Sequence, residues 1–557
     1  MKPVVILGGG INGAALAREL TLNRIPVHVV DIADIASGAT AYSSRLIHGG
    51  LRYLEHGDFR LVRESLEERK RLLKLAPHLV KPLCLHIPSS RRLGGFWAAT
   101  RRFLGMKAKS RQRGAWLIRA GLSLYDRYAN DNSLPRHKSM HSNAADALPL
   151  DAEEFPYQSA YWDGQVHYAE RLVVAMLEDA RRTAEANRID FAVTPYGDAT
   201  LQRSTLFVRH VRGHATHDVG IELAPSMVVN ATGAWLDHTL ARLEVDQETP
   251  LVGGTAGSHI LTANAELKQR LNGRGVYAEA KDGRPFFVLP FGNLTLIGTT
   301  DIKFQGDPRD ARATPGEIAY LIDSTNHLFA GLQFSRQDVA LHYCGIRPLP
   351  QSKSKDPGAI TRDHQIVENP DAGVPMISLV GGKLKTDRAF AEEVADLIIE
   401  RLNLRRTATS EDRPLPGAIH LHEAMMDAET ERARLAQQAD LSPESVAAIW
   451  DLYGDETSDV LEECQRRWPE TAAKLLPDSV LPESLVRYAI HCEWVTTIDD
   501  LISRRLMLLF SGQLTSAALQ RLAQILSEEG IFEESKIPAQ VTACRNALQD
   551  RYGLKLN

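Results

Sequence analysis

A short segment near the N-terminus combines residue types that could oxidise an alcohol. Residues 43–53 read Ser-Ser-Arg-Leu-Ile-His-Gly-Gly-Leu-Arg-Tyr. His48 offers an imidazole that can take up a proton near working pH, and Arg52 offers a planar fork for an anion. The paired glycines let the backbone approach a flat ring closely. Oxidation of a phosphorylated alcohol on a flavin would need these groups, and the alternative is a structural loop that happens to hold them.

The N-terminus carries the pattern of a dinucleotide-binding turn. The chain opens with a continuous apolar run, as expected for a strand buried on both faces. A predicted helix over 12–23 then leads to a second strand that ends at Asp31. Between the first strand and the helix stands G-x-G-x-x-G, at Gly8, Gly10 and Gly13. These glycines allow a diphosphate to approach the helix N-terminus, and Asp31 is placed to accept from a ribose hydroxyl. We therefore predict dinucleotide binding.

Length and composition exclude several classes of protein. A chain of 557 residues is too long for one core and implies two or three domains. The net charge of -5 gives no global attraction to nucleic acid. Its five cysteines lie far apart without metal-ligand spacing, which predicts a reduced cytoplasmic protein and no metal site. No run approaches the roughly 18 apolar residues that a membrane-spanning helix needs.

One local charge anomaly lies at residues 91–120. This stretch holds nine Lys and Arg residues and no acid, interleaved with aromatic and aliphatic side chains. Such a mixture is typical of a segment that lies on an anionic membrane surface. A nucleic-acid-binding arm would look similar, and a solvated basic loop is the third interpretation. We expect peripheral attachment to the inner face of the cytoplasmic membrane.

The opening segment closely resembles the Ser-Ser-Lys-Leu-Ile-His-Gly-Gly-Leu-Arg-Tyr signature of FAD-dependent, quinone-linked glycerol-3-phosphate dehydrogenases. Further motifs similar to that family follow in its order over nearly the whole chain. They lie at 287–290 and 297–308, 345–349, 359–363, 381–384, 491–494 and 499–505, the last of which includes Arg504-Arg505. Several independent motifs in one order make chance similarity implausible.

The resemblance implies an α/β fold of the glutathione-reductase type in three parts. The FAD-binding part would comprise about 1–85, 150–240 and 340–405, which together with the substrate and cap part forms a core over 1–405. Strand-like alternation between 250 and 345 predicts a largely antiparallel sheet that carries the substrate. The substrate and cap part would comprise about 86–149 and 241–339, of which 86–150 reads as irregular and basic. A helical domain is predicted over 406–557.

The resemblance and the chemistry of the side chains together imply specific roles. His48 would be the base, although it could instead orient the flavin or a loop carbonyl. Arg52 and Arg347 would clamp the phosphate, with Tyr53 as a hydroxyl donor. Lys383 precedes a helix, so that its ammonium and the positive helix end would favour charge on the reduced flavin. These are the predicted catalytic residues.

Two sets of binding residues complete the predicted site. The residues expected to contact FAD are Gly8, Gly10, Ile11, Asn12, Gly13, Asp31, Ser43, Ser44, Leu46, His48, Gly49, Ala231, Thr232, Gly233, Gly382, Lys383 and Leu384. Those expected at the substrate are Arg52, Tyr53, Arg347, Lys385 and Thr386.

The chain departs from the family pattern at several positions. Arg45 stands where the signature has lysine, and Ala256 precedes Gly-Ser-His where the family has lysine. The family's Val-Asp-Asp-Ala-Arg-Leu becomes Val-His-Tyr-Ala-Glu-Arg-Leu at 166–172, which includes His167. Lys385 and Asp387 stand where the family has a threonine and an aromatic after Gly-Gly-Lys-Leu. We expect FAD binding to be unaffected by these changes, whereas those near the pocket would alter the choice of substrate.

The sequence therefore predicts oxidation of sn-glycerol 3-phosphate to dihydroxyacetone phosphate on FAD, with electrons passed to membrane quinone. One alternative uses oxygen as acceptor, and another acts on a different hydroxy or amino compound. A third alternative is a flavin-binding protein without turnover. Whether the flavin is covalently held and whether the protein forms a homodimer stay open.

Overall fold

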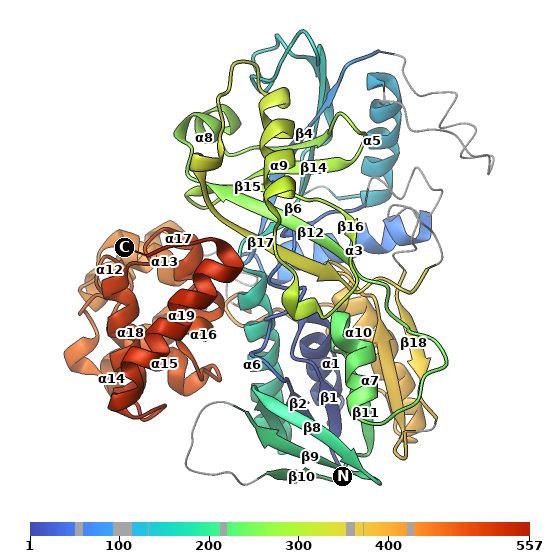
Figure 1. Ribbon diagram of the computed structural model, residues 1–557, viewed down its shortest axis with the longest axis vertical. Helices are drawn as coiled ribbons and strands as arrows, with labels where there is room; N and C mark the ends of the chain where they lie inside the picture. Colours follow the sequence, from blue (N-terminus) through green and yellow to red (C-terminus); the bar gives the residue numbers. More distant parts are fainter. Residues whose placement is uncertain are drawn as a thin grey trace.

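The apolar run at the N-terminus forms β1 (Val4–Leu7), the strand around which the first sheet is built in this computed structural model. The structure describes residues 1–50, 59–92, 114–131, 133–211, 220–352, 363–370, 372–419 and 428–556. Figure 1 shows three parts, with the first sheet at the bottom, a second sheet above it and a helical C-terminal part beside both.

The first sheet has six strands in the order β18-β19-β11-β1-β2-β7. Five of them run parallel and the edge strand β18 is antiparallel. The other five strands of this sheet are β2 (Val27–Val30), β7 (Phe191–Thr194), β11 (Met227–Asn230), β18 (Gln365–Glu368) and β19 (Met376–Val380). Because parallel sheets are buried on both faces, β1 consists of four buried apolar residues without alternation, and β2 has three valines and one buried histidine.

Helices and a small sheet cover the two faces of the first sheet. One face packs against α1 (Ile11–Leu22), α6 (Ala169–Asn187) and α10 (Asp387–Arg401). The other packs against α7 (Leu236–Arg242) and the strands β8 (Gly197–Gln202), β9 (Thr205–His210) and β10 (Ile221–Leu223). The arrangement confirms the predicted fold class.

The second sheet is largely antiparallel, as predicted, and runs in the order β16-β12-β15-β14-β13-β4-β6-β3, with β17 on β12 and β5 on β6. Its strands are β3 (Leu46–Ile47), β4 (Val80–Ser89), β5 (Lys138–His141), β6 (Tyr157–Val166), β12 (Thr255–Thr262), β13 (Gly275–Glu279), β14 (Pro285–Phe291), β15 (Leu294–Gly298), β16 (Ile302–Lys303) and β17 (Val339–Arg347). Its flanking helices are α3 (Phe59–Leu75), α5 (Ala115–Ala129), α8 (Ala265–Leu271) and α9 (Pro315–Leu328).

Two details of this part differ from the sequence-based expectation. The expectation that 86–150 is irregular was wrong, because α5 is a regular helix whose Ile118, Leu122 and Tyr125 are buried at helical spacing. Its many basic neighbours in the sequence hide that apolar stripe. In addition, β4 and β6 pair with each other in the second sheet, although both lie mainly in segments predicted to bind FAD.

The C-terminal part is helical, as predicted. Its helices are α12 (Ala428–Ala439), α13 (Pro443–Tyr453), α14 (Thr457–Arg467), α15 (Glu483–Cys492), α16 (Ile498–Asp500), the π-helical turn η7 (Leu501–Arg505), α17 (Leu508–Ser511), α18 (Ser516–Glu528) and α19 (Ile537–Tyr552). We call residues 428–556 the helical domain.

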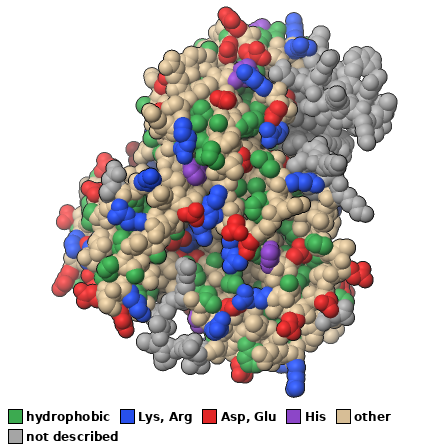
Figure 2. Space-filling model, viewed as in Figure 1, with side chains coloured by type: hydrophobic (Ala, Val, Ile, Leu, Met, Phe, Trp, Pro, Cys, Tyr) green, Lys and Arg blue, Asp and Glu red, His purple; other side chains and the backbone are tan. Residues whose placement is uncertain are grey.

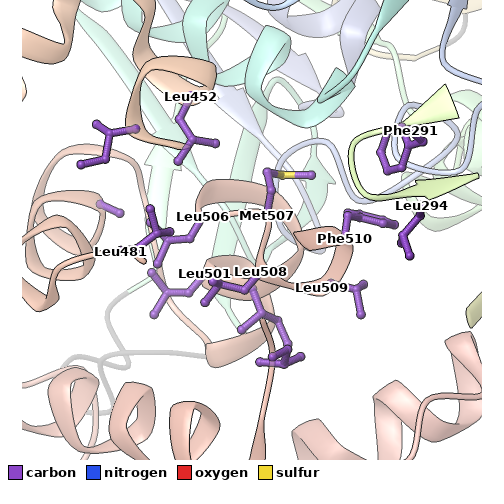
Figure 3. Close-up of a cluster of buried hydrophobic side chains, with 14 of the residues drawn as sticks. Phe291, Leu294, Leu452, Leu481, Leu501, Leu506, Met507, Leu508, Leu509 and Phe510 are labelled. Carbon is purple, nitrogen blue, oxygen red and sulfur yellow. The ribbon is translucent and has the colours of Figure 1, made fainter. Parts of the chain in front are cut away.

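An apolar contact fastens the helical domain to the second sheet. Figure 3 shows Phe510 pointing toward Phe291 and Leu294, and the two phenyl rings meet edge to face with centroids 5.7 Å apart. Phe510 is only 4% exposed. One continuous core therefore extends from the second sheet into the helical domain. Within the described ranges, no helix is both long and apolar enough to cross a bilayer.

Candidate active site

The glycine turn after β1 is shaped by close contacts between chain segments. A Cβ atom on Gly8, whose φ is +108°, would lie 2.6 Å from the carbonyl oxygen of Ala231, and one on Gly13 would lie 2.0 Å from the oxygen of Gly8. Gly10 differs, because the atom nearest to a Cβ added there would be the Thr40 hydroxyl oxygen, at 3.5 Å. Gly10 therefore borders open space at the N-terminus of α1, where a diphosphate would be received.

Asp31 follows β2 and supports the same turn. Its carboxylate accepts hydrogen bonds from the backbone N–H of Gly9 at 2.7 Å and of Ala33 at 2.9 Å. Burial raises the pKa of Asp31 to about 6, against the opposing effect of these two hydrogen bonds. The side chain also lines the cavity described next, so a ribose hydroxyl could donate to it.

A large cavity runs from this turn to the second sheet. Its volume is about 1170 Å3, above the roughly 300–1,000 Å3 typical of pockets for drug-sized ligands. It lies along the carboxyl ends of the parallel strands, and the loops that follow β1, β2, β11 and β19 line it. The glycine cradle, the acid at its rim and this volume fit an extended dinucleotide such as FAD together with a small substrate.

Most of the predicted binding residues line this cavity. The structure brings together Gly8, Gly10, Ile11, Asn12, Asp31, Ser43, Ser44, Leu46, His48, Ala231, Thr232, Gly233, Arg347, Gly382, Lys383, Leu384 and Lys385. Three others lie behind the cavity wall: Gly13 packs on Gly8, Gly49 donates its N–H to Tyr125 and Asp163, and Thr386 is 2% exposed at the start of α10. Arg52 and Tyr53 lie outside the described residues.

His48 is held by contacts on both its ring and its backbone. Its Nδ1 accepts from the N–H of Gly50 at 3.1 Å, which places the proton of the neutral ring on Nε2. The Lys385 ammonium donates to the His48 carbonyl oxygen at 2.6 Å and lies 3.4 Å from Nδ1. The nitrogen of His48 that has a lone pair therefore faces Lys385.

A second imidazole, which the sequence analysis did not assign, lines the same cavity. His259 on β12 is 2% exposed, exchanges a hydrogen bond of 2.9 Å with the Ser44 hydroxyl, and stacks on Tyr343. Burial lowers the pKa of His259 to about 3, and the charge of Arg347 acts in the same direction. The Gly-Ser-His motif was available as a signal, but nothing local indicated that β12 faces the cavity.

Arg347 ends β17 and is oriented by several oxygen atoms. Its guanidinium donates to the Asp301 carboxylate at 3.0 Å and to the Thr299 hydroxyl at 2.8 Å. Its side chain remains 24% exposed. A Cβ on Gly257 would lie 2.3 Å from its Nη2 atom, so glycine at that position makes room for the fork. Sequence reasoning missed Asp301 as the orienting residue.

The departures from the family pattern fall mostly outside the cavity. Ala256 is buried in the second sheet and His167 is half-buried beside it, and neither lines the cavity. Asp387 is 1% exposed, and burial together with Glu68 raises its pKa to about 8. Lys385 alone among these four residues lines the cavity. A change in substrate would therefore act most directly through Lys385.

Arg45, the remaining departure, also borders the cavity, but its guanidinium is engaged in a structural contact. Its guanidinium is fully buried and donates to both carboxylate oxygens of Glu170, at 2.6 and 2.8 Å. It also lies over the rings of Phe291 and Phe510, 5.2 and 4.8 Å from their centroids. The arginine thus ties the His48 segment to α6 and to the helical domain.

Comparison with known proteins agrees with this geometry. Residues 3–388 match the FAD dependent oxidoreductase family, and residues 408–536 match the C-terminal domain of alpha-glycerophosphate oxidase. A glycerol-3-phosphate dehydrogenase of Synechocystis is 33% identical over 97% of this chain and 94% of its own. A D-erythritol 1-phosphate dehydrogenase of Brucella abortus is 30% identical over 90% of this chain and 93% of its own.

A solved structure supports the fold over its full extent. The glycerol-3-phosphate dehydrogenase of Bacillus halodurans, crystallised with FAD, superposes with a TM-score of 0.72 over 99% of this chain and 95% of its own, at 20% identity. FAD is thus the cofactor that the cavity accommodates. The chain belongs to the family of FAD-dependent glycerol-3-phosphate dehydrogenases.

Proposed function

We propose that the protein oxidises sn-glycerol 3-phosphate to dihydroxyacetone phosphate on FAD and passes the electrons to a membrane quinone. The observation that carries this proposal is a single cavity in which a dinucleotide cradle adjoins cations and imidazoles. Among them are the cations Arg347, Lys383 and Lys385 and the imidazoles His48 and His259. The names of the Synechocystis and Brucella relatives support a phosphorylated polyol as substrate.

The phosphate would be held by the guanidinium of Arg347. A planar fork binds a dianion in two parallel hydrogen bonds, and Asp301 with Thr299 fixes the plane of this fork before substrate arrives. Arg52 and Tyr53, the other predicted members of the clamp, lie outside the described residues. Lys385 would add a further positive charge close to His48.

His48 is the better candidate for the base. Oxidation of a secondary alcohol releases a hydride from carbon, which bound FAD accepts, and a proton from oxygen. Burial lowers the pKa of His259 to about 3, so its ring is a weak base at neutral pH. His48 would take the proton at Nδ1, which requires the hydroxyl to approach the edge that Lys385 also faces.

The phosphate clamp predicts a selective kinetic defect. Loss of a charged fork that holds a dianion typically costs a factor of about 30 to 1,000 in substrate efficiency. Arg347→Ala should therefore lower kcat/KM for glycerol 3-phosphate by that factor while FAD content stays unchanged. Arg309→Ala is a matched control, because this arginine lines the same cavity but is 73% exposed and paired with Asp307. Equal use of glycerol and its phosphate ester by the native enzyme would refute the clamp.

The base assignment predicts a change in both rate and pH profile. His48→Ala should lower turnover by about 10²- to 10⁴-fold, the usual range for removal of a general base, and higher pH should restore part of the rate. His259→Asn is the comparator, for which we expect a smaller loss. A His48 variant with the native rate and pH profile would assign His48 to structure instead.

A second candidate substrate is a longer polyol phosphate. The Brucella relative is named for D-erythritol 1-phosphate and spans nearly as much of this chain as the Synechocystis one does. Lys385, a departure from the family pattern that lines the cavity, is the residue through which such a difference would act. Relative kcat/KM values for the two phosphate esters decide between them.

We further propose that the quinone is reached through the surface around α5. Trp116 and Tyr128 on this helix are 52% and 38% exposed, and Arg119 lies over the Trp116 ring. The first six residues of this helix are the last part of the basic stretch 91–120, of which 93–113 lies outside the described residues. Figure 2 shows acidic and basic side chains interspersed over the displayed face, so the displayed face offers no basic patch that would compete with this stretch for a membrane.

Membrane attachment of this kind depends on charge and on the exposed tryptophan. Each basic residue near an anionic surface contributes about 1 kcal/mol, and screening reduces this share as salt rises. Trp116→Ser combined with Arg119→Gln should weaken binding to anionic vesicles and lower quinone reduction, while reduction of a soluble dye persists. The matched control alters Leu475 and Lys474, an exposed apolar-basic pair on the helical domain. Absence of vesicle binding by the native enzyme at low salt would contradict the proposal and favour oxygen as acceptor.

A further inference from the structure

The loop that follows Asp31 is part of the FAD-binding turn. Besides the two hydrogen bonds to the Asp31 carboxylate, the N–H of Ala36 donates to the carbonyl of Gly9 at 2.9 Å. The N–H of Tyr196 donates to the carbonyl of Ala33 at 2.9 Å. The position of residues 31–36 thus determines where Gly9 and the Asp31 carboxylate lie.

The next acid in this loop, Asp34, forms ion pairs with two arginines of the helical domain. Arg505 donates from Nη2 to Asp34 Oδ1 at 2.8 Å and from Nη1 to Oδ2 at 2.9 Å. Arg504 donates from Nε to the same Oδ2 at 2.5 Å. The side chains of Asp34 and Arg505 are 0% exposed and that of Arg504 is 4% exposed. Two arginines therefore share one fully buried carboxylate.

This convergence depends on the local backbone of η7. Adjacent residues on a regular helix point in different directions, whereas Arg504 and Arg505 end a π-helical turn, a feature found frequently at functional sites. Arg505 is further fixed by its Nε, which donates to the carbonyl of Glu493 at 2.7 Å. Arg504 also donates to Asp499 at 2.7 Å. The tail motif Arg504-Arg505 is thus explained by a contact with the N-terminal turn.

A second connection closes the network on the same loop. Asp500 accepts from Arg504 at 3.0 Å and from the Tyr196 hydroxyl at 2.6 Å. Tyr196 is the residue whose N–H holds the carbonyl of Ala33. Acids and arginines of the helical domain therefore reach the loop from two sides, through Asp34 and through Tyr196.

The cost of this network indicates a positional role. Burying charged groups costs about as much free energy as their attraction returns, so a buried ion pair is weak evidence for stability alone. Burial raises the pKa of Asp31 to about 6; the charge of Asp34 also raises it, and the charge of Arg504 lowers it. Arg504 therefore offsets part of the effect that Asp34 has on the acid facing the cavity, besides holding the loop that carries this acid.

We infer that Arg504 and Arg505 are positioning residues for the cofactor: by holding Asp34 they keep Asp31 and Gly9 in the geometry that receives the adenosine ribose and the diphosphate of FAD. They lie behind the loop and do not line the large cavity as Arg347 does. The helical domain is accordingly a part of the FAD site. The inference holds whichever polyol phosphate is oxidised.

Equilibrium binding of FAD to the full-length apoprotein tests this inference. One lost hydrogen bond to a buried charge typically corresponds to a factor of about 10 to 100 in affinity. Arg505→Lys keeps the charge but loses the bidentate fork, and Asp34→Asn removes the acid. Both should raise the Kd for FAD by about 10- to 100-fold and accelerate FAD release from the holoenzyme.

The control is a second buried ion pair between the same two parts of the chain. Arg171 on α6 donates to Glu493 at 2.7 Å, and their side chains are 4% and 7% exposed. Arg171→Lys should lower the thermal midpoint as Arg505→Lys does, yet change the Kd for FAD less than about threefold. Equal losses of FAD affinity in the two variants, or none in either, would overturn the inference.

A measurement on the native chain covers the case in which these variants do not fold. Coupling between two sites is reciprocal, so FAD must protect the contact that holds its loop. Hydrogen exchange of peptides spanning 501–506 and 31–36 should slow together when the apoprotein binds FAD. Protection of residues 8–14 with unchanged exchange at 501–506 would overturn the inference just as directly.

Discussion

Three segments that are far apart in the sequence meet at the carboxyl edge of the first sheet, and the rest of the site depends on their close approach. A Cβ on Gly8 would lie 2.6 Å from the carbonyl oxygen of Ala231, and one on Gly382, whose φ is +86°, would lie 2.4 Å from the amide of Asn12. Any side chain at these positions would push the loops after β1, β11 and β19 apart. Because residues of these loops line the cavity, the distance between the loops determines the shape of its floor.

The helical domain extends this constraint from the outside. It contacts the His48 segment through Phe510 and Arg45, and the Asp31 loop through Arg505 and Asp34. In the first contact the buried guanidinium of Arg45 lies over the Phe510 ring. In the second the Asp34 carboxylate accepts hydrogen bonds from both Arg504 and Arg505. Both sides of the cavity, the one that holds His48 and the one that holds Asp31, are thereby connected to the helical domain.

The local patterns in the sequence were sufficient to predict the first two strands of the first sheet and most of the cavity lining. The run before Gly8, the acid at the end of β2 and the Ala-Thr-Gly after β11 all follow from period, turn chemistry and resemblance, and the structure places them around one cavity. What could not be predicted rests on contacts between distant residues. Arg505 and Asp34 are separated by 471 positions, and no local signal connects them. The helix α5 was missed for a different reason, since its apolar stripe is interleaved with arginines.

The candidate chemistry shows the same limit. His48 was singled out because its neighbours form a recognisable motif, whereas the contact between its ring and Lys385 arises from a loop that follows β19. His259 and Asp301 were seen as parts of motifs but received no role, because the face of a strand that lines a cavity depends on its partners in the sheet.

The central claim is that this cavity joins FAD to a phosphorylated polyol that it oxidises. Anaerobic mixing of the FAD-loaded protein with substrate tests it most directly, because reduction of the flavin is seen as loss of its visible absorption without any electron acceptor. We predict full bleaching by sn-glycerol 3-phosphate and none by glycerol. If only D-erythritol 1-phosphate bleached the flavin, the proposed oxidation of a polyol phosphate would stand, but the substrate would be the longer ester. An unchanged flavin spectrum with both phosphate esters would contradict the account.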